Sequence, residues 1–167
     1  MPVSHHEGRG WVADRLAAAR PRLVIDVGAG EGIYAMLMRP LTPDARWEAV
    51  EAWAPYVDRF GLAEKYDRVH VGDVRAFDWP ATPFTALLGD VVEHLPEADA
   101  RALLAELKAR ADHVMVSVPI VHIEQGPVGG NPYEAHLKHW TFEEMDELMD
   151  GCDSFRGDVL GRWWWTR

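Results

Sequence analysis

The sequence has little that would place it in a membrane or require an oxidising compartment. Its longest apolar stretch, residues 114–123, is interrupted by Ser117, Pro119 and His122, which leaves it too short and too broken to span a bilayer. The first residues lack the basic-then-apolar pattern of a signal peptide. The single cysteine, Cys152, permits no internal disulfide and fits a reducing compartment. We therefore expect a cytoplasmic protein with no membrane partner.

Positive charge is also scarce. The chain has 17 lysine and arginine residues against 27 aspartate and glutamate residues, for a net charge of −10. Nucleic-acid-binding proteins usually carry a basic face, so a nucleic-acid partner is not expected. The hydrophobic fraction of 48% and the charged fraction of 26% are typical of a soluble globular protein. A chain of 167 residues can form a full core, and we expect a single domain over residues 1–167.

Short apolar segments alternate with longer amphipathic ones along the chain. The expected strands are residues 22–27, 46–51, 68–71, 84–88 and 112–118, with one or two more within 154–165. The expected helices are residues 9–20, 31–38, 54–65, 97–110 and 141–150, the last opened by a capping box of Thr141 and Glu144. This alternation favours an α/β fold with a doubly wound, mostly parallel sheet flanked by helices.

A glycine-rich turn follows the first expected strand. Gly28, Gly30 and Gly32 alternate with other residues directly after the apolar segment 24–27. In an open α/β sheet, ligands bind where such a strand passes into its helix. Glycine permits positive φ there and lets a ligand approach the backbone. The turn is a weak signal by itself, so the surrounding residues must indicate the ligand.

Four acids fall at or just past the ends of four expected strands: Asp26, Glu51, Asp73 and Asp90. Parallel strands place all four at one edge of the sheet, where so much negative charge needs a partner. An acid after the second strand suits the hydroxyl groups of a ribose, and Asp73 could accept a hydrogen bond from an exocyclic amine. The set indicates a nucleoside that carries a sulfonium or ammonium group in place of several phosphates.

Together these segments resemble the class I S-adenosylmethionine-dependent methyltransferases over about residues 23–149. The sequence V-I-D-V-G-A-G-E-G-I-Y at 24–34 is similar to the first motif of that family. Glu51 lies where the family has its ribose-binding carboxylate, and G-D-V at 72–74 is similar to the segment that contacts adenine. The sequence D-V-V-E-H-L at 90–95 is similar to the strand-four motif D-V-x-E-H-L of small-molecule methyltransferases.

The resemblance implies a Rossmann-like sheet with the strand order 3-2-1-4-5-7-6, in which the C-terminal strands could be abbreviated. It implies S-adenosyl-L-methionine as cofactor and methyl transfer to an oxygen or nitrogen atom, most simply of a small molecule. The cofactor-binding residues that it implies are Asp26, Gly28, Gly30, Gly32, Glu51, Asp73, Val74 and Asp90. Among them Glu51 would hold the ribose and Asp73 the adenine, while Asp26 would hold either the turn or the methionine ammonium group.

The segment 119–140 is expected to be an active-site loop. Glycines and prolines exclude regular structure from its first half, and connections of this length are usually functional or disordered. Candidate proton acceptors are Glu134, His136 and His139, and candidate substrate contacts are His94, His122, Tyr133 and Trp140. The alternative is that the histidines and aromatic residues only anchor the loop. Donors for a metal are also present, but no spacing matches a standard zinc motif, so no metal is predicted.

Two other functions stay open for the whole chain. An NAD(P)-dependent oxidoreductase would use the same edge of a similar sheet, although the glycine spacing and the lack of a Tyr-x-x-x-Lys motif weaken that reading. A non-catalytic binding or scaffold subunit with a methyltransferase-like fold is the other alternative. The tryptophans at 163–165 could form a core strand, a wall of the substrate site or the surface of a homodimer.

Overall fold

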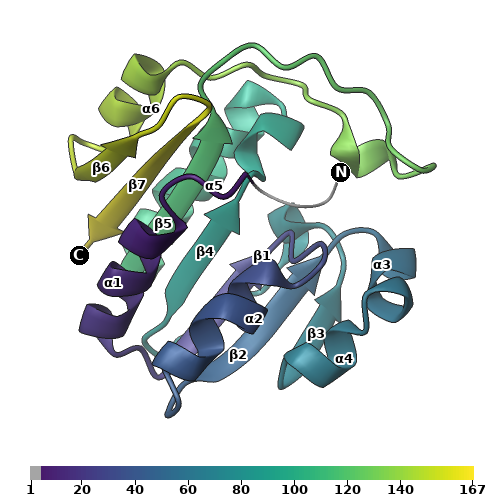
Figure 1. The fold of residues 1–167 in the computed structure, drawn as a ribbon, viewed down its shortest axis with the longest axis vertical. Coiled ribbons are helices and arrows are strands. Elements are labelled where there is room, and N and C mark those ends of the chain that lie inside the picture. The colour runs from purple at the N-terminus through teal and green to yellow at the C-terminus, as the bar shows by residue number, and fades with distance from the viewer. Residues whose placement is uncertain (1–4) are drawn as a thin grey trace.

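The computed structural model describes residues 5–167, which contain one seven-stranded sheet (Figure 1). The strands are β1 (Leu23–Val27), β2 (Arg46–Glu51), β3 (Arg68–Val71), β4 (Thr85–Gly89), β5 (His113–Pro119), β6 (Asp153–Arg156) and β7 (Leu160–Thr166). Their order is β3-β2-β1-β4-β5-β7-β6. β1 to β5 are parallel to one another, and β7 is antiparallel to β5 and β6. The predicted fold class and strand order are therefore confirmed.

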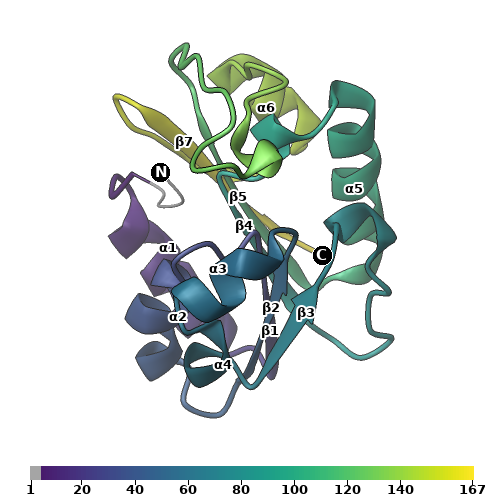
Figure 2. The same ribbon diagram turned by 90° about the vertical axis from the view of Figure 1, so that its right-hand side faces the viewer.

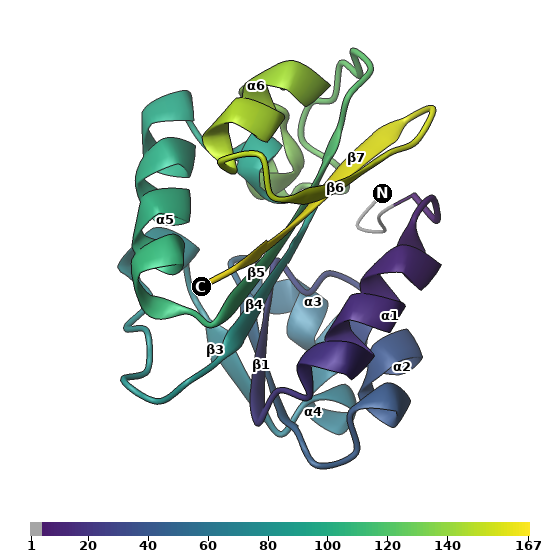
Figure 3. The same ribbon diagram turned by 90° about the vertical axis from the view of Figure 1, so that its left-hand side faces the viewer.

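Helices cover both faces of this sheet. They are α1 (Arg9–Ala19), α2 (Ile33–Met38), α3 (Ala54–Arg59), α4 (Leu62–Lys65), α5 (Glu97–Arg110) and α6 (Phe142–Leu148), with short 3-10 helices at Arg39–Leu41, Val74–Ala76, Val92–His94 and Pro132–Glu134. Figures 2 and 3 show α1, α2 and α4 on one face and α5 and α6 on the other. Among residues 5–167, no helix combines the length and the apolar composition needed to cross a membrane.

The core is divided by the sheet into two layers, and the C-terminal tryptophans contribute to both. Trp163 is fully buried in the layer that contains α5 and α6, where its ring lies 4.9 Å from that of Phe142 between centroids. Trp164 is 6% exposed and packs in the layer of α1 and α2. Neighbouring side chains on a strand point to opposite faces, so these two tryptophans are core residues.

One expected helix is divided in the structure, and the C-terminal region forms two of the one or two strands expected there. The expected helix 54–65 is divided into α3 and α4 because Gly61 adopts a left-handed conformation with φ of 57°, which a continuous helix does not contain. The expected strand region 154–165 is an antiparallel hairpin, β6 and β7. The capping box of Thr141 and Glu144 is present at the start of α6 as predicted.

The direction of the strands decides where a site can form. Because β1 to β5 are parallel, their carboxyl ends lie at one edge of the sheet. The glycine turn after β1, the segments after β2, β3 and β4, and the long loop after β5 all leave from that edge.

Candidate functional site

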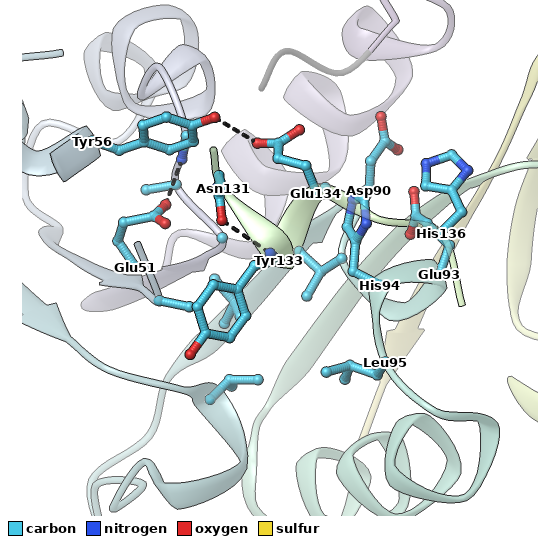
Figure 4. Close-up of a pocket in the computed structure, with 18 of the residues that line it drawn as sticks. Glu51, Tyr56, Asp90, Glu93, His94, Leu95, Asn131, Tyr133, Glu134 and His136 are labelled. Atoms are coloured by element: carbon cyan, nitrogen blue, oxygen red, sulfur yellow. Dashed lines mark hydrogen bonds between the residues drawn. The ribbon is translucent and has the colours of Figure 1, made fainter. Parts of the chain in front are cut away.

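A cavity of about 400 Å³ lies at the carboxyl edge of the sheet (Figure 4), within the size range of small-molecule sites. Five carboxylates line it: Glu51, Asp73, Asp90, Glu93 and Glu134. Among the described residues that line it there is no lysine or arginine. Like charges in a confined site repel anions, so the cavity is suited to a neutral or cationic ligand and not to a chain of phosphates.

The glycine turn forms one wall of this cavity. Gly28 has φ of 63° and donates its backbone N–H to the carbonyl oxygen of Val50 at 2.8 Å. A Cβ atom at Gly28 would lie 2.8 Å from Cγ2 of Val91, so a larger residue would not fit between β2 and the segment after β4. Gly30 also lines the cavity, whereas Gly32 does not and instead precedes α2 as its N-cap residue. The turn thus brings bare backbone against the cavity, as a closely approaching ligand requires.

Glu51 is the last residue of β2 and is held rigidly at the cavity wall. Its carboxylate accepts hydrogen bonds from the backbone N–H of Gly30 at 3.0 Å and of Trp53 at 2.8 Å. Glu51 is 5% exposed. Burial raises the pKa of its carboxyl, although the two hydrogen bonds lower it in part. A carboxylate has about four acceptor positions, so each oxygen can still accept a hydrogen bond from a ligand hydroxyl.

Asp73 lies just after β3 and is engaged by Arg75. It accepts hydrogen bonds from the Arg75 backbone N–H, from Nε, both at 2.9 Å, and from Nη2 at 2.6 Å. These bonds from the Arg75 side chain hold the pKa of the Asp73 carboxyl below its usual value, so it is ionised. Asp73 and its neighbour Val74 both line the cavity, and Asp73 keeps room for one further donor.

Asp26 lies behind the glycine turn and is not one of the residues that line the cavity. Its side chain is 1% exposed and accepts a hydrogen bond from the Tyr66 hydroxyl at 2.5 Å. Burial raises the pKa of Asp26 to about 7. Of its two predicted roles, this position fits support of the turn better than contact with a ligand.

Replacing Asp26 by asparagine is expected to reduce the pH dependence of stability. The folded protein keeps the Asp26 proton up to about pH 7, whereas the free side chain loses it near 3.8. The folded state therefore loses stability as the pH rises through this interval. Asparagine imitates the neutral acid and does not titrate. The difference in unfolding free energy, wild type minus Asp26→Asn, should therefore fall by about 2–4 kcal/mol between pH 4 and pH 8. Urea unfolding at several pH values measures this difference.

The matched control is Tyr66→Phe, which keeps the buried acid and removes only its hydrogen-bond donor. That variant should still lose stability as the pH rises. If the unfolding free energies of wild type and Asp26→Asn change by the same amount with pH, the prediction is wrong.

Asp90 and Glu93 lie at the other end of the cavity, after β4 (Figure 4). Asp90 has φ of 57° and accepts a hydrogen bond from the Ser117 hydroxyl at 2.7 Å. Glu93 is 2% exposed, and burial followed by the charge of Asp90 raises its pKa well above the usual value. The next residue, His94, also lines the cavity, and burial lowers the pKa of its imidazole.

Part of the loop after β5 covers this end of the cavity. Tyr133, Glu134 and His136, three of the candidate residues of this loop, line it. Glu134 is 7% exposed and accepts a hydrogen bond from the Tyr56 hydroxyl at 3.0 Å. The His136 backbone N–H donates to the Gln125 carbonyl at 2.9 Å, which ties the two halves of the loop together.

Three other predicted residues lie outside the cavity. His122 and His139 pack their rings against each other, with centroids 5.2 Å apart, and line a separate depression on the loop. Trp140 is fully buried in the core layer that contains α5 and α6. The last residues of the loop, 137–140, are not among those that line the cavity. The packing of His122, His139 and Trp140 is what the alternative expectation for the loop, that its histidines and aromatic residues anchor it, would produce.

Glu93 and Tyr56 are among the cavity residues that were not predicted as site residues. Glu93 is within the D-V-V-E-H-L segment, where the spacing of that motif was the available signal. Tyr56 carries no local signal, because its partner Glu134 is 78 residues away in the sequence.

The fold is shared with solved structures of methyltransferases. A proposed O-methyltransferase of Nostoc punctiforme PCC 73102 matches 91% of this chain with a TM-score of 0.65 and 16% identity, and 54% of that protein is covered. A second match is CalS10, an amino pentose methyltransferase of Micromonospora echinaspora involved in calicheamicin biosynthesis, whose structure was solved with S-adenosylmethionine. The match covers 94% of this chain and 89% of CalS10, with a TM-score of 0.61 and 22% identity.

A third match belongs to the Pnkp1/Rnl/Hen1 RNA repair complex, with 96% of this chain and 42% of that chain covered, a TM-score of 0.63 and 17% identity. This chain thus spans about half of two of these three proteins. No model of a protein family and no curated protein matches the sequence. At these identities the likeness is one of fold: a mixed seven-stranded sheet flanked by helices, as in Rossmann-like methyltransferases.

Proposed function

We propose that this protein is an S-adenosyl-L-methionine-dependent methyltransferase that acts on an oxygen or nitrogen atom of a small neutral or cationic acceptor. The observation that carries the proposal is the position of Glu51. It ends β2 inside the cavity, and the N–H of Gly30 from the glycine turn fixes one of its oxygens. A rigid, buried carboxylate beside bare backbone is suited to the two hydroxyl groups of an adenosine ribose.

The remaining cofactor contacts are proposed from the lining of the cavity. Gly28 and Gly30 would face the methionine part, and Asp73 with the Val74 amide would face the adenine. CalS10, which shares this fold, was solved with S-adenosylmethionine, and this supports the same cofactor here. The five carboxylates of the cavity would attract the sulfonium and ammonium charges of that cofactor.

The acceptor would bind at the end of the cavity formed by Asp90, Glu93 and the loop. Methyl transfer is a displacement in which the acceptor atom forms a bond to the methyl carbon and the carbon–sulfur electron pair stays on sulfur. Alignment of the two molecules would supply most of the acceleration. Glu134 or His136, which both line this end, would take the proton of a hydroxyl or amine acceptor.

An RNA acceptor is less compatible with this site, although one match belongs to an RNA repair complex. Protein–RNA contacts rely on lysine and arginine at the phosphates. The described part of the cavity offers carboxylates instead. An oxidoreductase that binds NAD(P) would have to place a pyrophosphate against the same acidic wall.

Calorimetric titration of the wild-type protein with S-adenosylmethionine, S-adenosylhomocysteine and NADH tests this proposal. We expect both adenosyl ligands to bind with micromolar affinity, corresponding to about −8 kcal/mol, and NADH to bind at least about tenfold more weakly. Transfer of label from methyl-labelled S-adenosylmethionine to pooled small hydroxyl and amine compounds would then identify the acceptor. Failure of both adenosyl ligands to bind would reject the proposal.

A further inference from the structure

Three side chains that can bind a metal ion meet at the loop end of the cavity (Figure 4). One ligand atom from each of Glu93, His94 and His136 lies within 4.8 Å of the other two. The first two belong to the short helix after β4 and the third to the loop after β5, so only the packing of these segments creates the group. Leu137 and Lys138 fix that packing by donating their backbone N–H groups to the Glu93 carbonyl, at 2.8 and 3.1 Å.

The Glu93 carboxylate lacks the partner that a buried charge needs. Neither of its oxygens has a hydrogen-bond partner within the described chain, although the side chain is 2% exposed. Removing a carboxylate from water without a compensating charge is energetically unfavourable. The other charged groups nearby make the deficit larger, because Asp90 is also acidic and no described lysine or arginine lines the cavity. A bound cation would supply the missing charge.

The two imidazoles are already oriented in the way that metal-binding histidines are. Nδ1 of His94 lies 3.1 Å from the carbonyl oxygen of Ala135, and Nδ1 of His136 lies 2.8 Å from that of Ile123. A carbonyl oxygen can only accept, so each Nδ1 carries a proton, and in the neutral ring Nε2 is then the nitrogen with a lone pair for a metal. Histidines that bind metals typically donate their second ring N–H to a backbone carbonyl or a carboxylate in this manner.

We infer that Glu93, His94 and His136 form a binding site for one divalent transition-metal ion. Two imidazole nitrogens and one carboxylate oxygen are a ligand set suited to ions such as Mn²⁺, Fe²⁺ or Zn²⁺. Three protein ligands leave coordination positions open, as in catalytic metal sites. All three residues line the cavity, so the open positions face the space proposed for the acceptor. The sequence predicted no metal because the standard motifs do not include this spacing.

The role of the metal rests on the proposed function. An acceptor hydroxyl bound to the ion would become more acidic, because a metal ion stabilises the oxyanion. Because His136 would hold the ion, the proton would pass to Glu134 or to solvent. The oxygen would form the bond to the methyl carbon, and the carbon–sulfur electron pair would stay on sulfur. The acceptor class would then be an alcohol or sugar hydroxyl.

Direct titration with MnCl₂ tests the site without any methyl-transfer assay. Free Mn²⁺ is followed by its electron paramagnetic resonance signal in EDTA-treated, desalted protein. We expect one Mn²⁺ per wild-type chain. Glu93→Gln and His136→Ala should each weaken binding by at least about tenfold, since even residues that only orient metal ligands change affinity by that much. Glu93→Gln keeps the shape of the side chain, so it controls for loss of folding.

The matched control is His139→Ala, which removes an exposed histidine of the same loop that is outside the cluster. It should bind Mn²⁺ within about twofold of wild type, because it leaves every proposed ligand in place. Lack of Mn²⁺ binding by the wild type up to millimolar concentration would overturn the inference, as would equal binding by Glu93→Gln. Titration of the same EDTA-treated samples with S-adenosylhomocysteine reports on the cofactor separately, so failure of either proposal is recognised by itself.

Discussion

Glu51→Ala is expected to weaken the binding of S-adenosylmethionine and S-adenosylhomocysteine by at least about tenfold. Hydrogen bonds to a charged group contribute about 1.5–3 kcal/mol each, and the variant loses those that the proposed ribose hydroxyls would make. It also leaves the N–H groups of Gly30 and Trp53 without their acceptor, so the wall of the cavity becomes less ordered. Calorimetry with both ligands measures the loss.

Two further variants separate recognition from general damage. Glu51→Gln keeps one acceptor oxygen and should lose less affinity than Glu51→Ala. Glu31→Ala removes an acid from the same glycine turn that does not line the cavity, and it should bind both ligands as the wild type does. If Glu51→Ala binds S-adenosylhomocysteine with wild-type affinity, Glu51 does not hold the ribose.

Gly89→Ala is expected to lower the free energy of unfolding by about 3 kcal/mol or more, at the upper end of overpacking effects. Gly89 ends β4, and a Cβ atom there would lie 2.1 Å from Cε2 of Tyr34. The tyrosine has little room to move, because it is 4% exposed and its hydroxyl accepts a hydrogen bond from Nη1 of Arg162 at 2.6 Å. Urea unfolding of the variant measures the effect.

The comparison variant is Gly126→Ala, in the loop after β5. A Cβ atom there would meet nothing within 4 Å, so its unfolding free energy should stay within about 0.5 kcal/mol of wild type. Exchanging Tyr34 for alanine in the Gly89→Ala background should relieve the collision, so the two substitutions should couple strongly. Equal stability of Gly89→Ala and wild type would show that the ring can move aside.

The elements predicted from the sequence agree with the structure where local residues decide them. The strands at 46–51 and 68–71 and the helix at 97–110 have the predicted bounds, because apolar periodicity and end signals are written in adjacent residues. The split at Gly61 was not predicted, because a glycine in a helical pattern can either be tolerated or end the helix. In the folded protein Gly61 takes the second course and divides the helix.

The loop shows the limit of sequence reasoning at the site. Its histidines, acids and aromatic residues all had suitable chemistry, yet His136 reaches the cavity and His139 does not. Residue type identifies what a side chain can do, but the direction of an irregular segment depends on its long-range hydrogen bonds. Here those include the bonds from residues 137 and 138 to the Glu93 carbonyl, which no local pattern indicates.

The sequence by itself determined the alternation of strands and helices, the glycine turn and the acids at the strand ends, because each depends on residues that are neighbours in the chain. Tertiary structure alone decided that Trp163 and Trp164 are both buried in the core, that Asp26 lies behind the turn, and that Glu93 meets His136. Those arrangements join segments far apart in sequence, and their geometry follows from how the layers pack.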